Sequence, residues 1–172
     1  NLTYSPKTNY SGGDSFTFRA NDGKADSNVG TVSITVASIN DKPVVAGQSV
    51  EVDEDGSVSI TLTGSDEDGD ALSFTVLSQP ENGTLSGTAP ALTYSPKANY
   101  SGGDRFTFKA NDGEADSNTA TVTISVASVN DKPVVAGQSV NVDEDGSVSI
   151  TLTGSDEDGD DLSFTVLSQP KN

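Results

Sequence analysis

The stretch "RFTFKANDGEADSNTATVTISVA", residues 105–127, decides the fold. Apolar and polar side chains alternate at every second position in RFTFKA (105–110) and in NTATVTISVA (118–127), which predicts two β-strands with one buried face each. The segment between them, NDGEADS, consists mainly of residues that favour turns. No segment of the chain has the 3.6-residue apolar period of a helix, so the sequence predicts an all-β protein.

A repeat of 90 residues runs through the whole chain. The motif LTYSPKTNYSGGD at 2–14 returns as LTYSPKANYSGGD at 92–104, and residues 1–82 and 91–172 share 69 identical positions and differ at 13. A period of about 90 residues suits tandem seven-stranded Greek-key β-sandwiches of the Ig-like kind, in which each unit contacts only its neighbours. Within one period the expected strands are 44–52, 58–63, 72–77, 83–86, 91–94, 105–110 and 118–127.

The phase of the repeat follows from NDKPVVAGQSV, which occurs at 40–50 and again at 130–140. Proline cannot pair in a central strand and biases its predecessor towards extended geometry, so the boundaries are placed at Lys42-Pro43 and Lys132-Pro133. Residues 43–132 are then a complete repeat, residues 1–42 the C-terminal half of a repeat, and residues 133–172 the N-terminal half of a following one. Each half is expected to hold three or four strands, with an exposed core face and marginal stability by itself.

The two halves are complementary, because 133–172 matches 43–82 and 1–42 matches 91–132. Joined, they lack only the counterpart of 83–90. They lie at opposite ends of the complete repeat, so we expect head-to-tail completion between chains. The alternative is that the positions at which the sequence starts and stops within a repeat are accidental, and that the halves do not pair between chains. No signal peptide is recognised, and the sequence is expected to be an internal piece of a longer chain.

The composition excludes several classes of function. The chain has 26 acidic and 9 basic side chains, a net charge of −17, and no His, Cys, Met or Trp. It therefore has no cysteine nucleophile, no Ser-His-Asp triad and no zinc site of the usual His/Cys type. The net charge would repel nucleic acid, and without an apolar stretch of about 18 residues no membrane insertion is expected.

The acidic side chains gather in loops that recur in each repeat, notably SDEDGD at 65–70 and again at 155–160. Two carboxylates ~4 Å apart repel by roughly 4 kcal/mol at an effective dielectric near 20. Calcium takes six to eight oxygen ligands and needs neither His nor Cys, so the loops predict Ca²⁺ binding. They are not EF-hands, because Ala71 and Leu77 stand where that loop needs Gly and Glu. The alternative is that Asp and Gly only form the turns.

The motif order, from VDEDGSVSITLTGSDEDGD through TYSPKANYSGGD to SVASVNDKPV, resembles the cadherin-like, Ig-like tandem repeats of large RTX-type bacterial surface adhesins. The resemblance covers the whole chain. It implies β-sandwiches strung end to end, with calcium stiffening the junctions between neighbouring repeats. It also implies a non-enzymatic extender at the bacterial cell surface that supports cell adhesion and biofilm formation.

Similarity to cadherins implies a ligand set. Glu54 resembles the glutamate that serves the junction after its own domain, Asn-Asp before Lys-Pro resembles the cadherin linker, and Asp66 and Asp68 resemble the Asp-x-Asp of the following domain. The implied ligands are Asn40, Asp41, Asp66, Asp68, Asp70 and Asp112 at the first junction, and Glu54, Asn130, Asp131, Asp156, Asp158 and Asp160 at the second. Asp22, the counterpart of Asp112, would complete the second site only if a neighbouring chain supplies it. Ser38, Lys42 and their counterparts depart from the cadherin linker, so one or two ions per junction are expected.

Two other functions are weighed against the extender. The aromatic residues of the FTF and SFTV segments could bind sugar, but their alternation favours core packing, with Asp104 of GGD bonding loop amides. A repeat could still bind a glycan or another copy of itself. Paired carboxylates could in principle hydrolyse glycosides, but near-identical repetition argues against a dedicated active site.

Overall fold

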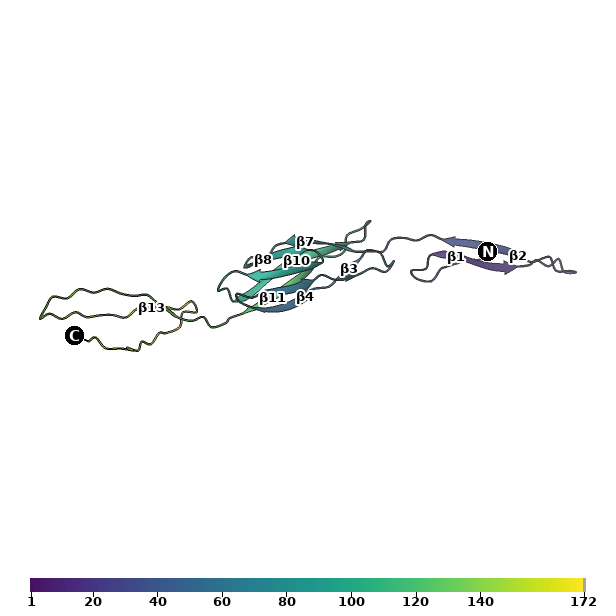
Figure 1. Ribbon diagram of the computed structural model, residues 1–172. Coiled ribbons are helices and arrows are strands. Elements are labelled where there is room, and N and C mark those ends of the chain that lie inside the picture. The colour runs from purple at the N-terminus through teal and green to yellow at the C-terminus, as the bar shows by residue number, and fades with distance from the viewer. Residues whose placement is uncertain (172) are drawn as a thin grey trace.

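The computed structural model describes residues 1–171, in which a central β-sandwich lies between two extended segments, all three roughly in line (Figure 1). The strands of the N-terminal segment are β1 (Gly12–Phe18) and β2 (Gly30–Val36), and those of the C-terminal segment are β12 (Val134–Val135) and β13 (Gly154–Ser155). The strands of the centre are β3 (Val44–Val45), β4 (Gln48–Asp53), β5 (Val58–Thr61), β6 (Gly64–Ser65), β7 (Ser73–Ser78), β8 (Gly83–Thr88), β9 (Ala91–Pro96), β10 (Gly102–Asn111) and β11 (Ala120–Ala127). Over the described range, nothing helical is long and apolar enough to cross a membrane.

The central sandwich has two facing sheets, with strand orders β4-β11-β10-β7 and β5-β9-β8. All pairs within these sheets are antiparallel except β4–β11, which is parallel. Seven strands in two sheets confirm the prediction of an all-β, seven-stranded sandwich. The position of the repeat boundaries stays a prediction.

The first expected strand, 44–52, is divided in two. β3 pairs with β6, whereas β4 pairs with β11. The division falls at Gly47, where a Cβ atom would lie 2.9 Å from the carbonyl oxygen of Thr121, so the crossing between the sheets leaves no room for a side chain. Asn118, expected within the last strand, instead binds the backbone of Val45 with its side chain, through its Nδ2 (2.8 Å) and Oδ1 (3.1 Å). Alternation alone carries no information on where a strand changes sheets.

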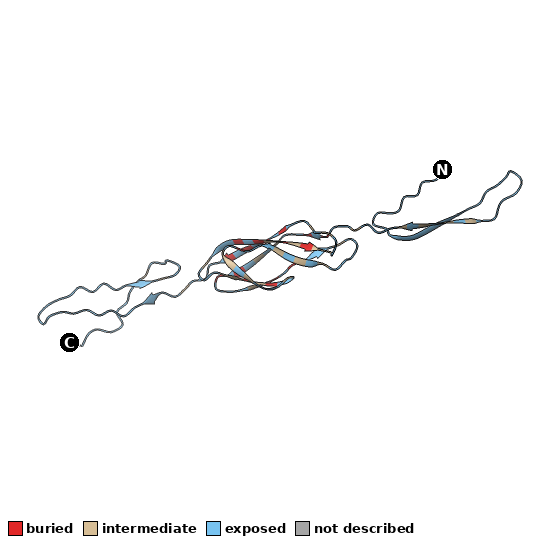
Figure 2. Ribbon diagram, turned by 90° about the horizontal axis from the view of Figure 1, so that it is seen from above, coloured by how far each residue is buried: buried red, intermediate tan, exposed pale blue. Residues whose placement is uncertain are grey.

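The core of the sandwich consists of the inward-facing residues of the alternating strands. On β10 these are Phe106, Phe108 and Ala110, all fully buried, and on β11 every second residue from Ala120 to Val126 is buried. Figure 2 shows this buried set confined to the central sandwich. Tyr94 is also fully buried, and Phe74 and Tyr100 pack against the same cluster. The aromatic residues therefore form core and its margin, as the alternation predicted.

Asp104 is a buried carboxylate at the start of β10. It accepts hydrogen bonds from the backbone N–H groups of Glu81 (2.9 Å), Asn82 (2.9 Å) and Arg105 (2.8 Å) and from the hydroxyl of Tyr94 (2.9 Å). Burial raises the pKa of Asp104, but these four hydrogen bonds together outweigh burial and hold that pKa below its ordinary value. The expected bonding to loop amides is confirmed, and it ties the β7–β8 loop to the core.

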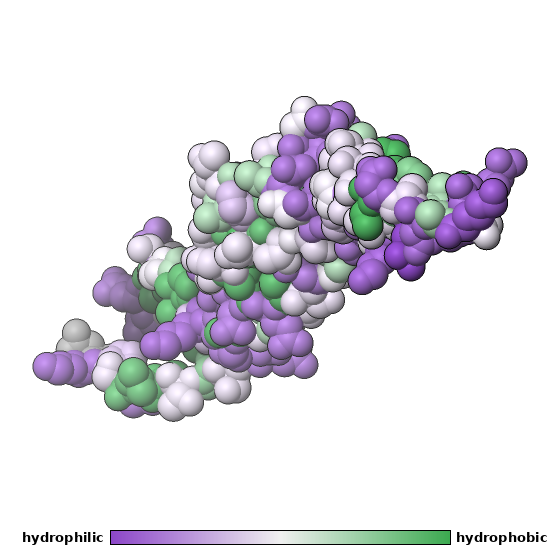
Figure 3. All heavy atoms as spheres, turned by 90° about the vertical axis from the view of Figure 1, so that its right-hand side faces the viewer, coloured by the Kyte–Doolittle hydropathy of each residue, from purple (hydrophilic) through white to green (hydrophobic). Residues whose placement is uncertain are grey.

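The flanking segments hold fewer strands than expected, two each. β1 and β2 pair in the register of their counterparts β10 and β11, and β12 and β13 in that of β3 and β6. These are pairs whose two strands lie in the same half of the repeat. The counterparts of β4, β5 and β7 in the C-terminal segment form no strands, because in the complete repeat their partners come from the other half. Apolar side chains consequently reach the surface near both extremes of the molecule (Figure 3).

Candidate metal centre at the junctions between repeats

The loop between β6 and β7 gathers three carboxylates at the end of the complete repeat that faces the preceding linker. Asp66, Asp68 and Asp70 each place one carboxylate oxygen within 4.8 Å of the others. Oδ1 of Asp66 accepts the N–H groups of Asp68 (3.0 Å) and Asp70 (3.2 Å), which closes the loop into a turn, and Gly69 takes the positive φ of 81° that the turn requires. The same three positions, Asp156, Asp158 and Asp160, form an equivalent cluster in the C-terminal half-repeat.

Turn formation accounts for only one oxygen of Asp66. Its second oxygen, Oδ2, is buried and has no hydrogen-bond partner among the described residues. A buried polar atom without a partner costs free energy, and native structures normally satisfy such atoms. Hard carboxylate oxygens are the donors that Ca²⁺ prefers, so the residues of this loop fit a calcium ion.

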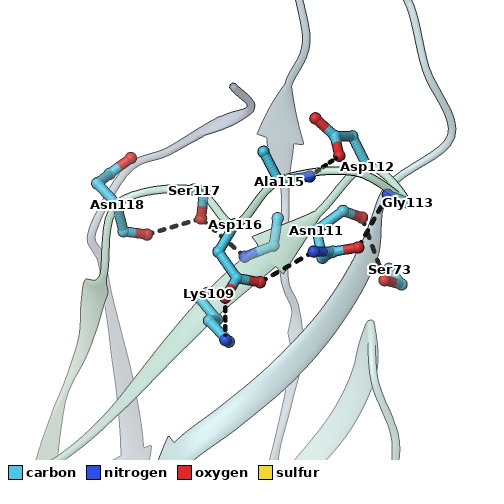
Figure 4. A network of polar contacts seen from close by, with 10 residues as sticks. Ser73, Lys109, Asn111, Asp112, Gly113, Ala115, Asp116, Ser117 and Asn118 are labelled. Atoms are coloured by element: carbon cyan, nitrogen blue, oxygen red, sulfur yellow. Dashed lines mark hydrogen bonds and ion pairs between the residues drawn. The ribbon is translucent and has the colours of Figure 1, made fainter. Parts of the chain in front are cut away.

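The first linker brings two further predicted ligands to this loop. The N–H group of Asp41 donates to Oδ2 of Asp68 (2.7 Å), and Nδ2 of Asn40 donates to Oδ2 of Asp112 (2.9 Å). Asp112 lies in the β10–β11 turn, where its other oxygen accepts the N–H groups of Glu114 (2.7 Å) and Ala115 (2.6 Å). Figure 4 shows this turn and its hydrogen bonds. The N–H of Ala115, the Asn40 amide and the N–H of Glu114, in that order of effect, lower the pKa of Asp112 and keep it ionised.

The second linker repeats the contact and adds a glutamate from the repeat before it. The N–H group of Asp131 donates to Oδ2 of Asp158 (2.6 Å). Glu54, which is buried, accepts the N–H group of Val129 (2.7 Å) and the hydroxyl of Ser128 (3.2 Å) through Oε1. Asn130 donates only to its neighbour, the carbonyl oxygen of Asp131 (2.6 Å), among the hydrogen bonds of residues 1–171.

The electrostatics of the second junction favour a cation. Partial burial raises the pKa of Asp131, and the nearby negative charges of Asp158, Asp55, Glu54 and Glu157 raise it further. These charges disfavour the ionised form of Asp131, because like charges in a partly dehydrated region repel. A bound divalent cation would reverse the sign of this interaction.

Two contacts across the junctions were absent from the prediction. Nδ2 of Asn99 donates to Glu157 (3.2 Å), and Nδ2 of its counterpart Asn9 donates to Glu67 (3.4 Å). The backbone N–H of Asn99 also binds Asp55 (3.3 Å). The signal in the sequence is the NYSGGD loop itself, which recurs in every repeat and lies at the end of the sandwich nearest the next linker.

Each junction brings together a different part of the predicted ligand set. The first contains Asn40, Asp41, Asp112 and the Asp66 cluster, and the second contains Glu54, Asn130, Asp131 and the Asp156 cluster. Asp22 joins neither of them. Its carboxylate accepts the N–H groups of Lys24 and Ala25 within its own turn, and these two hydrogen bonds lower its pKa, that from Ala25 having the larger effect.

The outer face of the four-stranded sheet has a hollow. Its lining residues are Ser78, Gln79, Glu81, Asn82, Gly103, Asp104, Arg105, Thr107, Thr121 and Thr123. None of them is aromatic, so the hollow offers no ring on which a sugar could stack.

The two sheets and the acidic junctions define this molecule as a tandem Ig-like, cadherin-like repeat protein. The model of the bacterial Ig domain family matches residues 1–35, 40–125 and 130–172, and the chain belongs to that family. The resemblance to cadherin-like and bacterial Ig-like repeats is thereby confirmed.

Similar proteins include two from Dictyostelium discoideum. Integrin beta-like protein E is 31% identical over 99% of this chain, and integrin beta-like protein B is 30% identical over 71% of it. The chain spans 10% and 7% of the length of these two relatives. Among solved structures, the human mucin-like protocadherin EC1-2 shares the fold, with a TM-score of 0.53 and 19% identity, covering 75% of this chain and 74% of that one. An endo-fucoidan hydrolase of glycoside hydrolase family 107 aligns at 27% identity with a TM-score of 0.44, over 72% of this chain and 20% of its own.

Proposed function

We propose that this chain is a calcium-stiffened, non-catalytic extender, part of a bacterial cell-surface adhesin of the RTX type. The observation that carries the proposal is the unpartnered, buried Oδ2 of Asp66 within a three-carboxylate loop that is hydrogen-bonded to the linker. A cation bound there would touch the following repeat and the linker at once, so it would restrict bending between repeats.

Calcium is the cation that the donor set favours. The loop and linker offer carboxylate, amide and backbone carbonyl oxygens and no nitrogen or sulfur ligand, and Ca²⁺ accepts such sets in flexible geometry where Mg²⁺ demands a near-ideal octahedron. The ligands at the first junction would be Asp66, Asp68, Asp70, Asp112, Asn40 and Asp41, and the corresponding set with Glu54 would serve the second. Extracellular calcium modules bind at roughly 10⁻⁴–10⁻³ M, which suits a surface location.

Near-identical repetition supports a mechanical role. An extender gains length from every added copy, whereas catalysis needs a single site, so two copies with 69 identical positions out of 82 fit the first requirement. The integrin beta-like names of two relatives agree with a role in adhesion at the cell surface. Support of biofilm formation is part of the proposed role. The partners of each repeat would then be its neighbours in the array.

The proposal is tested by thermal unfolding and small-angle X-ray scattering of the chain, with millimolar Ca²⁺ and with a chelator. At a free Ca²⁺ concentration about ten times the dissociation constant, each site adds about 1.4 kcal/mol to the free energy of unfolding. We expect a higher Tm and a longer, stiffer particle in Ca²⁺. Asp66→Asn should abolish most of the gain in the complete repeat while keeping the turn, since the amide oxygen still accepts both N–H groups.

The matched control is Glu114→Gln, which removes one charge from an exposed side chain outside the cluster. It should leave the Ca²⁺ response unchanged. Equal Tm and equal scattering curves with Ca²⁺ and with chelator would refute the calcium proposal.

A further inference from the structure

We propose that a hydrogen bond between an asparagine and a glutamate fixes the orientation of each repeat relative to the repeat before it, and that it does so without a metal ion. The pair is Asn99 and Glu157 at the second junction, and Asn9 and Glu67 at the first. The interaction surface is the β9–β10 loop, and its partner is the acidic loop of the following repeat. The proposal is independent of calcium, because neither member of the pair belongs to a three-carboxylate cluster.

The same pair of atoms forms this contact at both junctions. Nδ2 of Asn99 lies 3.2 Å from Oε2 of Glu157, and Nδ2 of Asn9 lies 3.4 Å from Oε2 of Glu67. The two members of each pair are 58 positions apart, so the contact joins one repeat to the next and does not close a local turn. Two occurrences with matching donor and acceptor indicate a property of the junction.

The backbone of the asparagine indicates what its side chain is for. Asn99 and Asn9 have positive φ angles of 55° and 57°, a conformation that glycine adopts most easily. The turn itself is closed by the backbone, since the N–H of Tyr100 donates to the carbonyl oxygen of Lys97 (3.1 Å). Within residues 1–171, the side-chain amide of Asn99 forms its hydrogen bond with Glu157 and none with its own repeat. A glycine would form this turn equally well, so what the asparagine adds is the contact with the following repeat.

The acidic loop uses different side chains for the metal cluster and for this contact. Asp156, Asp158 and Asp160 bring their oxygens together in the cluster, whereas Glu157, which lies between two of them in the sequence, reaches Asn99 in the preceding repeat. The donor is a neutral amide and the acceptor is a carboxylate. Such a hydrogen bond needs no cation, and the charge of the acceptor strengthens it.

The linker by itself leaves the orientation free. Among the described residues, it is hydrogen-bonded to the acidic loop through Asp158 alone, which accepts the N–H of Asp131 (2.6 Å) and the hydroxyl of Ser128 (3.5 Å). A single point of attachment allows the following repeat to swivel about the linker. Asn99 belongs to a different loop, which is held in place because its N–H donates to Asp55 of the same repeat (3.3 Å). A second attachment from this loop therefore gives the junction a defined angle.

The test measures the orientation by double electron–electron resonance on the full 172-residue chain in chelator. The chain has no cysteine, so spin labels attach only to cysteines that are introduced. One label is placed at Val134→Cys in β12, which pairs with β13, the strand that leads into the acidic loop. The other is placed at Ser59→Cys or at Thr123→Cys, two exposed positions on the two different sheets of the central sandwich. A bend towards one sheet shortens one of these distances and lengthens the other.

Two variants remove the contact from opposite sides. Asn99→Gly removes the amide and keeps a residue suited to the positive φ angle, and Glu157→Ala removes the acceptor. Without these changes, we expect one narrow peak for each pair of labels. Each variant should lower the ratio of this peak to the broad remainder about fivefold, as expected for the loss of one exposed hydrogen bond to a charged group. The double variant should broaden the distances no further, because both changes remove the same contact.

The matched controls make similar changes at neighbouring positions. They are Ala98→Gly in the same turn, and Asp161→Ala, which removes a carboxylate directly after the acidic loop at a position where the other copy has Ala71. Both should keep the narrow peaks, and circular dichroism melting of the central sandwich should be the same in Asn99→Gly as in the unchanged chain. Equal distance distributions in the unchanged chain and in Asn99→Gly, or further broadening in the double variant, would overturn the proposal.

Discussion

Replacing Phe106 with alanine is expected to lower the free energy of unfolding of the complete repeat by about 3–5 kcal/mol. Phe106 is fully buried on β10, in the middle of the core between the two sheets. Its truncation removes the transfer free energy of the ring and leaves a cavity that the rigid sheets on either side cannot fill by collapse. Denaturant unfolding of the chain in chelator measures the loss without a contribution from metal.

The matched control for this prediction is already in the sequence. Phe16 occupies the same place in the N-terminal half-repeat, on β1, but is 38% exposed. Phe16→Ala should not change the unfolding of the central sandwich. A loss below about 1 kcal/mol for Phe106→Ala, or an equal loss for both variants, would contradict the position of the core.

The strands could be predicted from the sequence wherever one face is buried and the other is in water. β10 and β11 show this pattern without interruption, and the expected 105–110 and 118–127 lie close to the observed strands. The change of sheet between β3 and β4 could not be predicted, because it depends on a close approach of Gly47 to a strand far along the chain. Likewise, the half-repeats have fewer strands than expected because the strands that would pair with them are missing. The local alternation of apolar and polar residues carries no information on which strands pair.

The candidate site, like the fold, could be predicted from the sequence only in part. The residues of the Asp66 cluster are near neighbours in the sequence, as are Asn40 and Asp41 of the linker, and the N–H group of Asp41 donates to Asp68. That these residues bind a metal stays a prediction. The contact between Asn99 and Glu157 joins two repeats across 58 positions, and no spacing rule points to it. Asp22 stays apart from both clusters because its turn faces the opposite end of its half-repeat, a consequence of topology rather than of residue type.

Asp104→Asn is expected to destabilise the complete repeat by about 3 kcal/mol, although it changes a single atom of the side chain. In the carboxylate, Oδ1 accepts the N–H groups of Glu81 and Arg105, and Oδ2 accepts the N–H of Asn82 and the hydroxyl of Tyr94. An amide has one oxygen and one NH₂ group, so in either orientation the NH₂ group faces two hydrogen-bond donors where the carboxylate placed an acceptor. The buried hydroxyl of Tyr94 or the loop amides then lose their acceptor, at about 1–3 kcal/mol for each group.

The pH dependence separates this effect from a change in packing. The pKa of Asp104 in the folded chain lies below its ordinary value of about 3.9, so its ionised form is favoured by folding. Its contribution is therefore complete above about pH 4 and is lost as the pH falls through the lowered pKa. The difference in unfolding free energy between the unchanged chain and Asp104→Asn should be constant near neutral pH and shrink in acid.

Asp14→Asn makes the same chemical change at a position that is not buried, since Asp14 is exposed. It should leave the unfolding of the central sandwich unchanged at every pH. The difference in unfolding free energy between Asp104→Asn and the unchanged chain could instead stay constant down to pH values well below the ordinary carboxylate pKa. That result would mean that the side chain acts by its shape, and that the charge of the carboxylate does not strengthen its four hydrogen bonds. A shrinking difference would identify Asp104 as the charged anchor that joins the β7–β8 loop to the core of the complete repeat.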